Sequence, residues 1–341
     1  MAQGAGERYI ITGGGGFIGS NLIATLTSKR PEAAILVVDD FRSGSVINIV
    51  EACERRGVPP FGGDVISEPT GDLDWDDILD AVKPNAVFHL AAITDTTVLD
   101  ERQMLLDNVE GFRGMLHACV ENSTPLVYAS SAATYGSPAE GFDKVPFPES
   151  AAGKPNNVYG FSKWQMETLH RRLSAEVAKP GTRPPHVVGL RYFNVYGPGE
   201  ARKGKMASMP YQLAQQIIAG NRPKLFTDGE QARDQVHVDD VVAMTLAGAD
   251  ADATAGVYNC GSGQATSFNA IAEAVRKGIG ADETRFATEY FEMPPSVREF
   301  YQEFTCADLA QAKAGLDWAP QKNPIEAIEA YAAFLAGTNS R

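Results

Sequence analysis

The sequence predicts an α/β protein built on a doubly wound parallel sheet, with a smaller C-terminal α/β lobe. Two observations carry that prediction. Short apolar runs recur through the first half of the chain, and stretches with helical spacing separate them. The runs are apolar throughout instead of alternating with polar residues, which is typical of parallel strands covered by helices on both faces.

Five apolar runs are expected to form the strands of this sheet. The first run, Tyr9–Thr12, leads into glycines, and helical spacing then extends from Phe17 to Ser28. The others are Ile35–Val38, Ala86–Leu90, Leu126–Ala129 and Val187–Leu190.

The regular alternation weakens after Asn194, where loops, prolines and aromatic residues become more frequent. We therefore expect a dinucleotide-binding, Rossmann-like domain over residues 8–198, to which 234–263 return. Residues 199–233 and 264–335 are expected to form a substrate-binding lobe at the carboxyl edge of the sheet, where open α/β folds bind ligands.

A glycine-rich turn joins the first strand to the first helix. Gly13, Gly16 and Gly19 keep a GxxGxxG spacing, and Phe17 and Ile18 open the helix. Without side chains, such a turn lets backbone N–H groups and the helix N-terminus meet a pyrophosphate. These residues are therefore candidate ligands of a dinucleotide.

An acidic residue stands where the adenosine ribose of that dinucleotide is expected. Asp39 ends the second strand twenty positions after Gly19, although a strand-end turn residue is the alternative interpretation. Asp39 and Asp40 together disfavour a 2′-phosphate, whereas Arg42 would neutralise one. NAD is the expected cofactor, and NADP remains the alternative.

Two further strand ends are expected to complete the dinucleotide site. Asp64 and Val65 would frame the adenine. Residues Leu90, Ala91 and Ala92 close another strand near the pyrophosphate.

A tyrosine and a lysine share one face of a predicted helix. Tyr159 and Lys163 form a YxxxK motif, and an ammonium near a phenol stabilises the phenolate and lowers its pKa. A surface lysine beside a core tyrosine is the ordinary explanation of such a pair. Ser131, which closes a strand about 28 residues before Tyr159, favours proton transfer at a sugar hydroxyl instead.

The composition excludes several classes of partner. The net charge of −13 opposes a general nucleic-acid or anionic-membrane surface, but it leaves an anionic small ligand open. No run of about 18 apolar residues indicates a membrane span, and the N-terminus is expected to be a polar tail. The four cysteines are far apart, which predicts reduced thiols in a cytoplasmic protein and no metal site.

The segment ARKGKMAS concentrates positive charge in this acidic chain. Arg202, Lys203 and Lys205 fall within four positions, just after a glycine-rich turn at 197–199. From composition alone, a solvated basic loop explains the segment.

Several motifs together resemble a known family over almost the full chain. They are YASSAATYG at 128–136, NVYGFSK at 157–163, RYFNVYGP at 191–198, the Lys203 and Met206–Ser208 loop, Pro223–Phe226, Arg233–Asp234 and Tyr301–Gln302. The sequence resembles the extended short-chain dehydrogenase/reductase superfamily, and most closely its ADP-L-glycero-D-manno-heptose 6-epimerases.

The resemblance implies that the C6″ hydroxyl of the heptose is oxidised and then reduced from the opposite face. Tyr159 and Lys203 would be the two proton-transfer groups, Ser131 would hydrogen-bond the reacting oxygen, and Lys163 would bind the nicotinamide ribose. Further implied cofactor contacts are Asn108 and Val195, and implied substrate contacts are Asn194, Lys205, Phe226, Arg233 and Tyr301.

The resemblance also implies a homo-oligomer, commonly a pentamer in this family, and a product destined for the lipopolysaccharide core or another surface glycan. Arg233 has a physical case of its own as a pyrophosphate ligand, with a structural ion pair to Asp234 as the alternative. Arg202 and Lys205 either stay solvated or help to bind the diphosphate.

Three other functions were weighed against the heptose 6-epimerase. A UDP-hexose 4-epimerase needs only the serine, tyrosine and lysine, and a non-catalytic NAD(P)-binding sensor would need none of them. A 4,6-dehydratase needs an acidic pair directly after the strand-end serine, but Ala132 and Ala133 occupy those positions.

Overall fold

The computed structural model describes residues 6–95, 98, 100–137, 144–294 and 301–338. Its centre is a seven-stranded sheet in the order β10-β6-β5-β4-β1-β2-β3, and every neighbouring pair is parallel. The strands are β1 (Arg8–Thr12), β2 (Ala34–Val38), β3 (Asp64–Ile66), β4 (Ala86–His89), β5 (Leu126–Ser131), β6 (Val187–Tyr192) and β10 (Gly256–Cys260). The predicted α/β fold class is confirmed.

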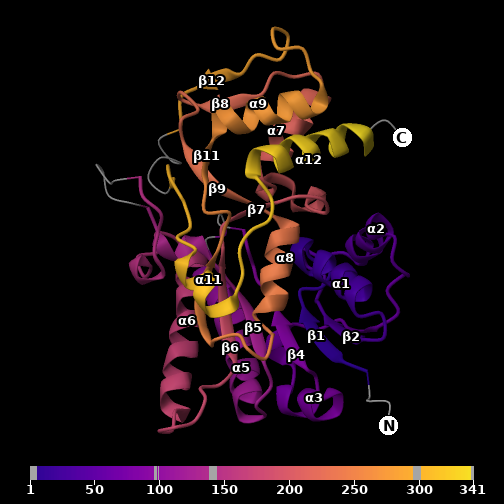
Figure 1. The fold of residues 1–341 in the computed structure, drawn as a ribbon, viewed down its shortest axis with the longest axis vertical. Coiled ribbons are helices and arrows are strands. Elements are labelled where there is room, and N and C mark those ends of the chain that lie inside the picture. Colours follow the sequence, from indigo (N-terminus) through magenta and orange to yellow (C-terminus); the bar gives the residue numbers. More distant parts are fainter. Residues whose placement is uncertain (1–5, 96–97, 99, 138–143, 295–300, 339–341) are drawn as a thin grey trace.

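Helices cover both faces of this sheet (Figure 1). One layer consists of α1 (Phe17–Lys29), α2 (Val46–Arg56) and α8 (Val238–Ala247). The other consists of α3 (Trp75–Val82), α5 (Gly111–Glu121) and α6 (Val158–Val177). Short helices in the connections are α4 (Glu101–Leu105), η1 (Thr70–Asp72), η2 (Leu106–Glu110), η3 (Ala132–Tyr135) and η4 (Glu149–Ala151).

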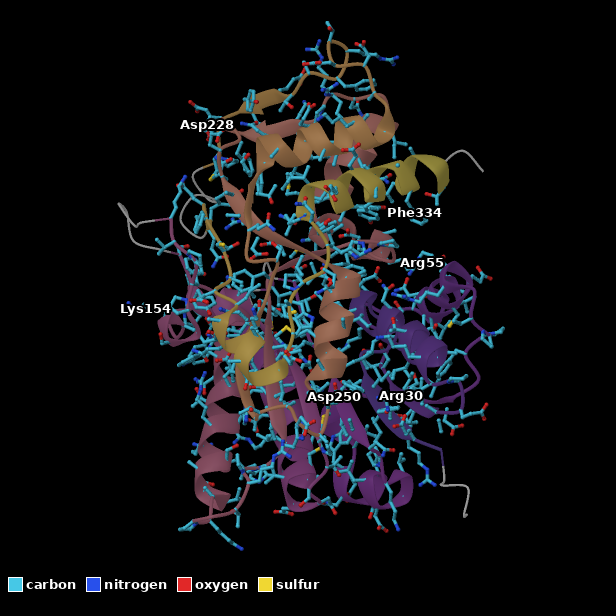
Figure 2. The ribbon with its side chains drawn as sticks, in the orientation of Figure 1. Arg30, Arg55, Lys154, Asp228, Asp250 and Phe334 are labelled. Atoms are coloured by element: carbon cyan, nitrogen blue, oxygen red, sulfur yellow. The ribbon has the colours of Figure 1, made fainter. Side chains whose placement is uncertain are left out.

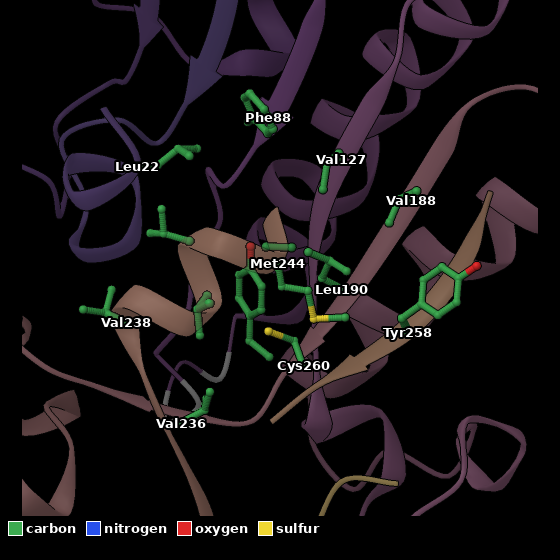
Figure 3. Packing of buried hydrophobic residues seen from close by; sticks show 14 of the residues in the cluster. Leu22, Phe88, Val127, Val188, Leu190, Val236, Val238, Met244, Tyr258 and Cys260 are labelled. Atoms are coloured by element: carbon green, nitrogen blue, oxygen red, sulfur yellow. The ribbon is translucent and has the colours of Figure 1, made fainter. Parts of the chain in front are cut away.

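The apolar strand sequences explain this two-sided cover. Successive residues of a strand point to opposite faces, so Ile10 joins one buried cluster and Ile11 the other. Val127 and Val188 lie in the cluster of Ile11, which Figure 3 shows together with Val238 and Met244 of α8. A strand that is apolar at every position therefore contributes to both halves of the core.

The chain order of the strands creates a crevice beside the first strand. The connection from β1 runs towards β2, whereas β4 lies on the other side of β1, so the strand order reverses between β1 and β4. Ligands of open α/β sheets bind at the carboxyl ends of strands at such a reversal. The glycine-rich turn after Thr12 and the segment after His89 both lie there.

A second group of elements lies beyond that edge, in the upper part of Figure 1. It contains α7 (Met209–Ile218), α9 (Phe268–Ile279) and α12 (Pro324–Thr338), which share a buried cluster with Leu225 and Phe286. A parallel pair is formed by β8 (Lys224–Phe226) and β12 (Glu289–Phe291).

A small mixed sheet and two shorter helices connect the two parts. The sheet has the order β11-β9-β7, with β7 (Asn194–Tyr196), β9 (Ala232–His237) and β11 (Ala265–Ser267). The helices are η5 (Ala201–Met206) and α11 (Ala310–Leu316), and α11 packs back on β10. The division into domains at 198, 233 and 263 stays a prediction.

Arg55 of α2, labelled in Figure 2, joins α1 to the segment after β7. Its guanidinium donates to Asn21 Oδ1 of α1 at 3.1 Å and to the Pro198 carbonyl at 3.4 Å. Among the described residues, no helix is both long and apolar enough to span a membrane. The same residues contain no cluster of histidine, cysteine or carboxylate side chains suited to a metal ion.

Candidate active site

The glycine-rich turn after β1 has no room for side chains. Gly13 has a φ of 69°, and a Cβ there would lie 2.6 Å from the Ala91 nitrogen. A Cβ on Gly19 would lie 2.2 Å from the Gly13 carbonyl oxygen. The turn therefore presents bare backbone, closely packed against the segment after β4, at the N-terminus of α1.

The other residues predicted around this turn lie beside it. Phe17 is buried and Ile18 half-buried in the first turn of α1, and Gly16 precedes them as its N-cap. Leu90 donates its N–H to the Thr12 carbonyl at 3.1 Å, and Ala91 donates to Thr12 Oγ1 at 3.2 Å. Residues 90–92 are thus held against the end of β1.

Asp39 is a buried carboxylate tied to the glycine-rich turn. Its Oδ2 accepts from the Gly15 N–H at 2.8 Å, and its Oδ1 accepts from the Phe41 N–H at 2.8 Å. Burial raises the pKa of Asp39, and these two hydrogen bonds oppose that shift. Asp39 therefore helps to hold the turn, as the alternative interpretation expects. Its role as a ligand of the adenosine ribose stays a prediction.

Arg42 is engaged by two carboxylates. Its Nε donates to Asp40 Oδ2 at 2.5 Å, and its Nη1 donates to Asp107 Oδ2 at 2.6 Å. A guanidinium neutralised twice, close to the buried Asp39, is poorly suited to a 2′-phosphate. This arrangement favours NAD over NADP. Asp64 and Val65 are exposed on β3, the edge strand next to β2.

Ser131, Tyr159 and Lys163 come together from β5 and α6. Asn157 begins α6 by accepting from the Gly160 N–H at 2.8 Å, which fixes Tyr159 in the first turn. Ser131 ends β5 and caps η3 by accepting from the Ala133 N–H at 3.1 Å. Lys163 is buried and donates to the Ala129 carbonyl at 2.8 Å.

Burial shifts the pKa values of the two α6 residues. Burial raises the pKa of Tyr159, and the neighbouring Ser131 hydroxyl opposes that shift. Burial lowers the pKa of Lys163 to about 7. Both groups are desolvated and Lys163 is directed to a backbone carbonyl, so a lowering of the Tyr159 pKa by Lys163 stays a prediction for the enzyme at work.

Asn108 is fully buried and serves as a bridge between elements. Its Oδ1 accepts from the Ile93 N–H at 2.8 Å, and its Nδ2 donates to the Ile93 carbonyl and to Ser162 Oγ, both at 3.0 Å. It thereby fixes the segment after β4 to the helix that carries Tyr159 and Lys163. A direct cofactor contact of Asn108 stays a prediction.

A cavity of about 240 Å³ lies between the small sheet and residues 203–209, which follow β7 in the chain. Its walls bring together Asn194 and Val195 of β7, Lys203 of η5 and Arg233 of β9. All four were predicted as site residues, three from the resemblance alone. Buried Gln235 also lines this cavity, although no motif in the sequence pointed to it.

The three cations of the ARKGKMAS segment have different surroundings. Arg202 donates to Asn48 Oδ1 at 2.8 Å and pairs with Glu51, both on α2. Lys205 is 70% exposed and lies 3.6 Å from Asp95 Oδ2 in the segment after β4. Arg202 and Lys205 therefore each interact with an acidic side chain outside the segment.

Lys203 alone of these three cations enters the cavity. Its amine lies 5.4 Å from the centre of the Phe17 ring, at the start of α1. Burial lowers the pKa of Lys203, and the neighbouring Glu200 carboxylate opposes that shift. The interpretation of the whole segment as a solvated basic loop is therefore wrong for Lys203.

Arg233 is a buried cation without an acidic partner. Within the described part of the chain, no carboxylate lies within ion-pair distance of it, and its Nη1 has no hydrogen-bond partner. Asp234, the alternative partner, instead accepts hydrogen bonds from Ser262, Gly263 and Ala307. Burial lowers the pKa of Arg233 to about 10, so it remains charged at neutral pH.

Aromatic rings surround this arginine. Its guanidinium lies 4.9 Å from the centre of the Tyr301 ring, and Tyr301 packs edge-on against Phe226 at 5.8 Å. Phe226 also contacts the exposed ring of Phe291 at 4.8 Å. An unpartnered guanidinium beside aromatic faces suits a diphosphate and its attached base.

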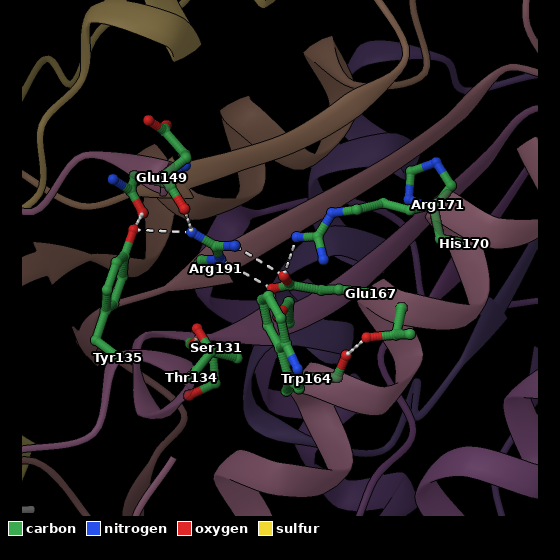
Figure 4. Close-up of polar contacts among 12 residues, drawn as sticks. Ser131, Thr134, Tyr135, Glu149, Trp164, Glu167, His170, Arg171 and Arg191 are labelled. Atoms are coloured by element: carbon green, nitrogen blue, oxygen red, sulfur yellow. Dashed lines mark hydrogen bonds and ion pairs between the residues drawn. The ribbon is translucent and has the colours of Figure 1, made fainter. Parts of the chain in front are cut away.

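A buried ion pair holds the catalytic elements together (Figure 4). Arg191 of β6 donates to Glu167 of α6 at 2.8 and 2.7 Å, and Ser130 donates to the same carboxylate at 2.6 Å. Arg191 also donates to the Tyr135 hydroxyl of η3 at 2.9 Å. The sequence analysis assigned no role to this pair, although Glu167 follows Lys163 at helical spacing on the same face.

The site fits the dinucleotide that the sequence predicts. Bare glycine backbone at a helix N-terminus suits a pyrophosphate, buried Asp39 suits a ribose, and the Lys163 amine at the end of β5 suits the second ribose. Backbone N–H groups, a carboxylate and an amine at the carboxyl end of the sheet are thus the groups that would hold NAD.

Comparison with known proteins places this geometry in context. The ADP-L-glycero-D-manno-heptose-6-epimerase of Helicobacter pylori is 32% identical, covers 97% of this chain and 96% of its own, and has a TM-score of 0.81. The UDP-glucose 4-epimerase of Thermotoga maritima, solved with UDP-glucose, is 26% identical, with 97% and 99% covered and a TM-score of 0.80. MoeE5, solved with UDP-glucose and NAD, is 26% identical, with 97% and 99% covered and a TM-score of 0.75.

Residues 9–261 match the family described as the NAD dependent epimerase/dehydratase family. That range includes the glycine-rich turn, Asp39, the serine, tyrosine and lysine of the catalytic elements, Lys203 and Arg233. The chain belongs to the NAD dependent epimerase/dehydratase family, and it is an NAD-dependent enzyme of nucleotide-linked sugars.

Proposed function

We propose that this enzyme inverts C6″ of ADP-D-glycero-D-manno-heptose to give the L-glycero epimer. The observation that carries the proposal is the position of Lys203. Its amine lies in the same cavity as Asn194 and Arg233, beside Phe17 of the cofactor-binding turn. Lys203 would be the second proton-transfer group of the reaction, besides Tyr159.

Each residue has a defined task in this reaction. Bound NAD supplies the acceptor, and then the donor, of the C6″ hydride. Tyr159 takes the proton of the C6″ hydroxyl, while Ser131 donates a hydrogen bond to the same oxygen. When the resulting ketone has turned over in the pocket, Lys203 delivers the proton to that oxygen from the other side. Inversion benefits from proton-transfer groups on two sides of the carbonyl, since the oxygen can then exchange its proton in either orientation of the ketone.

The nucleotide end of the substrate would lie at the end of the cavity that Arg233 lines. Arg233 would bind the diphosphate, and Phe226 and Tyr301 would contact the ADP portion and the sugar. Asn194 is exposed at the end of β7 and would contact the sugar nucleotide. Lys205, which is exposed in the same loop as Lys203, would help to bind the substrate.

A UDP-hexose 4-epimerase is the second candidate. The similarity to the Thermotoga maritima enzyme supports it, and Ser131, Tyr159 and Lys163 would suffice for its chemistry. A separate proton-transfer lysine in the cavity has no task in that reaction. Dehydration is disfavoured because Ala132 and Ala133 follow Ser131 in η3, where an acid and a base would be needed.

Three further expectations accompany the proposal as predictions. They are a cytoplasmic location, a homo-oligomeric state such as a pentamer, and a product used for the lipopolysaccharide core or another surface glycan.

The direct test is the configuration of the product. The purified protein is incubated with ADP-D-glycero-β-D-manno-heptose without added reductant, and C6″ is assigned by proton NMR. Formation of the L-glycero epimer is expected. If this sugar is unchanged while a UDP-hexose is converted at C4″, the heptose assignment is wrong and the second candidate is correct.

Two variants test the two-group mechanism. Lys203→Ala and Tyr159→Phe should each lower kcat by at least about 100-fold while NAD binding is retained, because each removes one proton-transfer group. Lys277→Ala, at a 58% exposed position on α9, is the control and should keep the activity. Full activity of Lys203→Ala would overturn the mechanism.

A further inference from the structure

Glu200 is a fully buried carboxylate at the start of the segment that carries Lys203. Acidic side chains are almost never fully buried unless they are paired. Glu200 Oε1 accepts from the Ser208 hydroxyl at 2.8 Å and from the Gly197 N–H at 3.2 Å. Its Oε2 accepts from the Ser208 N–H at 2.6 Å. One carboxylate therefore joins the two ends of the loop formed by residues 197–208.

Lys203 lies near the middle of that loop and depends on it for position. Its backbone N–H donates to the Glu200 carbonyl at 2.9 Å, and its side chain crosses to the Phe17 ring. The neighbouring Arg202 and Lys205 have carboxylates of their own, Glu51 and Asp95, outside the loop. The Glu200 charge acts on Lys203, and each of the two opposes the effect of burial on the pKa of the other.

The other titratable groups around Glu200 do not compete for this role. Burial raises the pKa of Tyr331 on α12 and of Tyr211 on α7, and the Glu200 charge adds to both shifts. A hydrogen bond between the Tyr331 hydroxyl and the Glu200 carboxylate adds further to the first, so both phenols are neutral and Tyr331 is a further partner of the carboxylate. His237 lies beside Gly197, and burial lowers its pKa, so it is also neutral at pH 7. Arg55 on α2 is directed to Asn21 and the Pro198 carbonyl.

We propose that Glu200 is a positioning residue for Lys203: its carboxylate closes the 197–208 loop and places a negative charge near the amine in the cavity. The proposal deepens the proposed function, because it concerns one of that mechanism's two proton-transfer groups. A loop without this closure would leave Lys203 on a flexible basic segment. A loop without this charge would leave the amine in the cavity with no acid to stabilise its protonated form.

The test measures the reactivity of Lys203 itself and needs no sugar substrate. The full-length protein is labelled with trace acetic anhydride between pH 6 and 10, and Lys203 and Lys205 are quantified by mass spectrometry of their peptides. Glu200→Gln keeps a hydrogen-bond acceptor but removes the charge, so neutral Lys203 should be more abundant. We expect its labelling near pH 7 to increase about tenfold, while that of Lys205 is unchanged.

A second variant separates position from charge. Glu200→Asp keeps the charge but is one methylene shorter, so it cannot reach both Gly197 and Ser208. Its Lys203 labelling profile should stay closer to that of the wild type than the profile of Glu200→Gln. Turnover of ADP-heptose, where the enzyme converts it, should fall at least tenfold because the loop opens. An unchanged Lys203 profile in folded Glu200→Gln would overturn the proposal.

Two outcomes keep the test decisive. If Glu200→Gln does not fold, it is combined with Lys203→Met: recovery of folding supports the coupling of the two residues, and continued unfolding overturns it. If labelling shows the coupling but ADP-heptose is not converted, the proposed substrate fails while the assignment of Glu200 stands.

Discussion

Single residues give the clearest evidence for the chemistry of this site. Arg233 and Lys203 both carry charge into partly desolvated surroundings, where an unpaired cation is unfavourable unless a ligand compensates it. Arg233 has an Nη1 without a hydrogen-bond partner among the residues that the structure describes, and Lys203 lines the same cavity. An anionic substrate that bridges the two would satisfy both residues.

Arg233→Lys should weaken nucleotide binding by roughly 10- to 100-fold, because lysine keeps the charge but loses the bidentate fork. Isothermal titration with ADP, and with UDP for comparison, measures this effect without the sugar. Arg222→Lys is the control, since Arg222 is 49% exposed in the same part of the molecule. Equal ADP affinity in wild type and Arg233→Lys would show that Arg233 serves packing alone.

Residues in local motifs could be predicted from the sequence, and residues whose role depends on burial could not. The glycine spacing and the YxxxK motif are local, so Gly13, Tyr159 and Lys163 could be proposed from the sequence as site residues. Glu200 resembles any loop glutamate until the fold encloses it between Gly197 and Ser208. The burial that acts on the pKa of Tyr159 could not be predicted for the same reason, because desolvation is a tertiary property.

At the scale of elements, the Arg191–Glu167 pair fixes three pieces of backbone. Glu167 lies on α6 four residues after Lys163, and Ser130 on β5 directly precedes Ser131. Burial acts to raise the pKa of Glu167, but the hydrogen bonds from Arg191 and Ser130, together with the charges of Arg191 and Arg171, hold that pKa below its usual value. The catalytic groups thus share one rigid support.

Glu167→Leu should destabilise the protein by about 3–5 kcal/mol, since it leaves the Arg191 charge buried and without its partner. The double variant Arg191→Met/Glu167→Leu should recover most of that loss, because apolar side chains of similar size replace a buried pair well. Urea unfolding followed by circular dichroism measures both values. A double variant no more stable than Glu167→Leu would contradict the explanation.

The elements themselves were predictable to different degrees. All five apolar runs form strands of the main sheet, because burial on both faces requires apolar residues at every position. The short strands β3, β7 and β8 have three residues each, too few for any period to be visible. The partly polar β10 was not identified as a strand, because Asn259 and Cys260 owe their burial to neighbours distant in sequence.

At the scale of the whole molecule, two buried histidines make folding sensitive to acid. Burial, followed by the Lys163 charge, lowers the pKa of His89 to about 3. Burial, followed by the Arg171 charge, lowers that of His170 to about 4. The unfolded imidazoles titrate near 6.5, so below that pH the unfolded state binds protons that the folded state does not.

The free energy of unfolding should therefore fall as the pH decreases from about 6.5 towards 4, by at most about 1.4 kcal/mol per pH unit for each histidine. His170→Gln should reduce that dependence of the unfolding free energy on pH by up to about 1.4 kcal/mol per pH unit. Urea unfolding at pH 7, 6 and 5 measures the slopes, with His117→Gln at an exposed position as the control. An unaltered slope in His170→Gln would refute this assignment.

The C-terminal helix α12 has a consequence for how the protein is made. Its Ile328, Tyr331 and Ala332 complete the buried cluster of α7 and α9, so that cluster cannot close before α12 has left the ribosome. The apolar side of α7 that α12 covers must wait while about 120 further residues are synthesised, and that of α9 while about 60 are. A premature stop codon before residue 324 would therefore yield a chain with an intact glycine-rich turn and an open, aggregation-prone upper half.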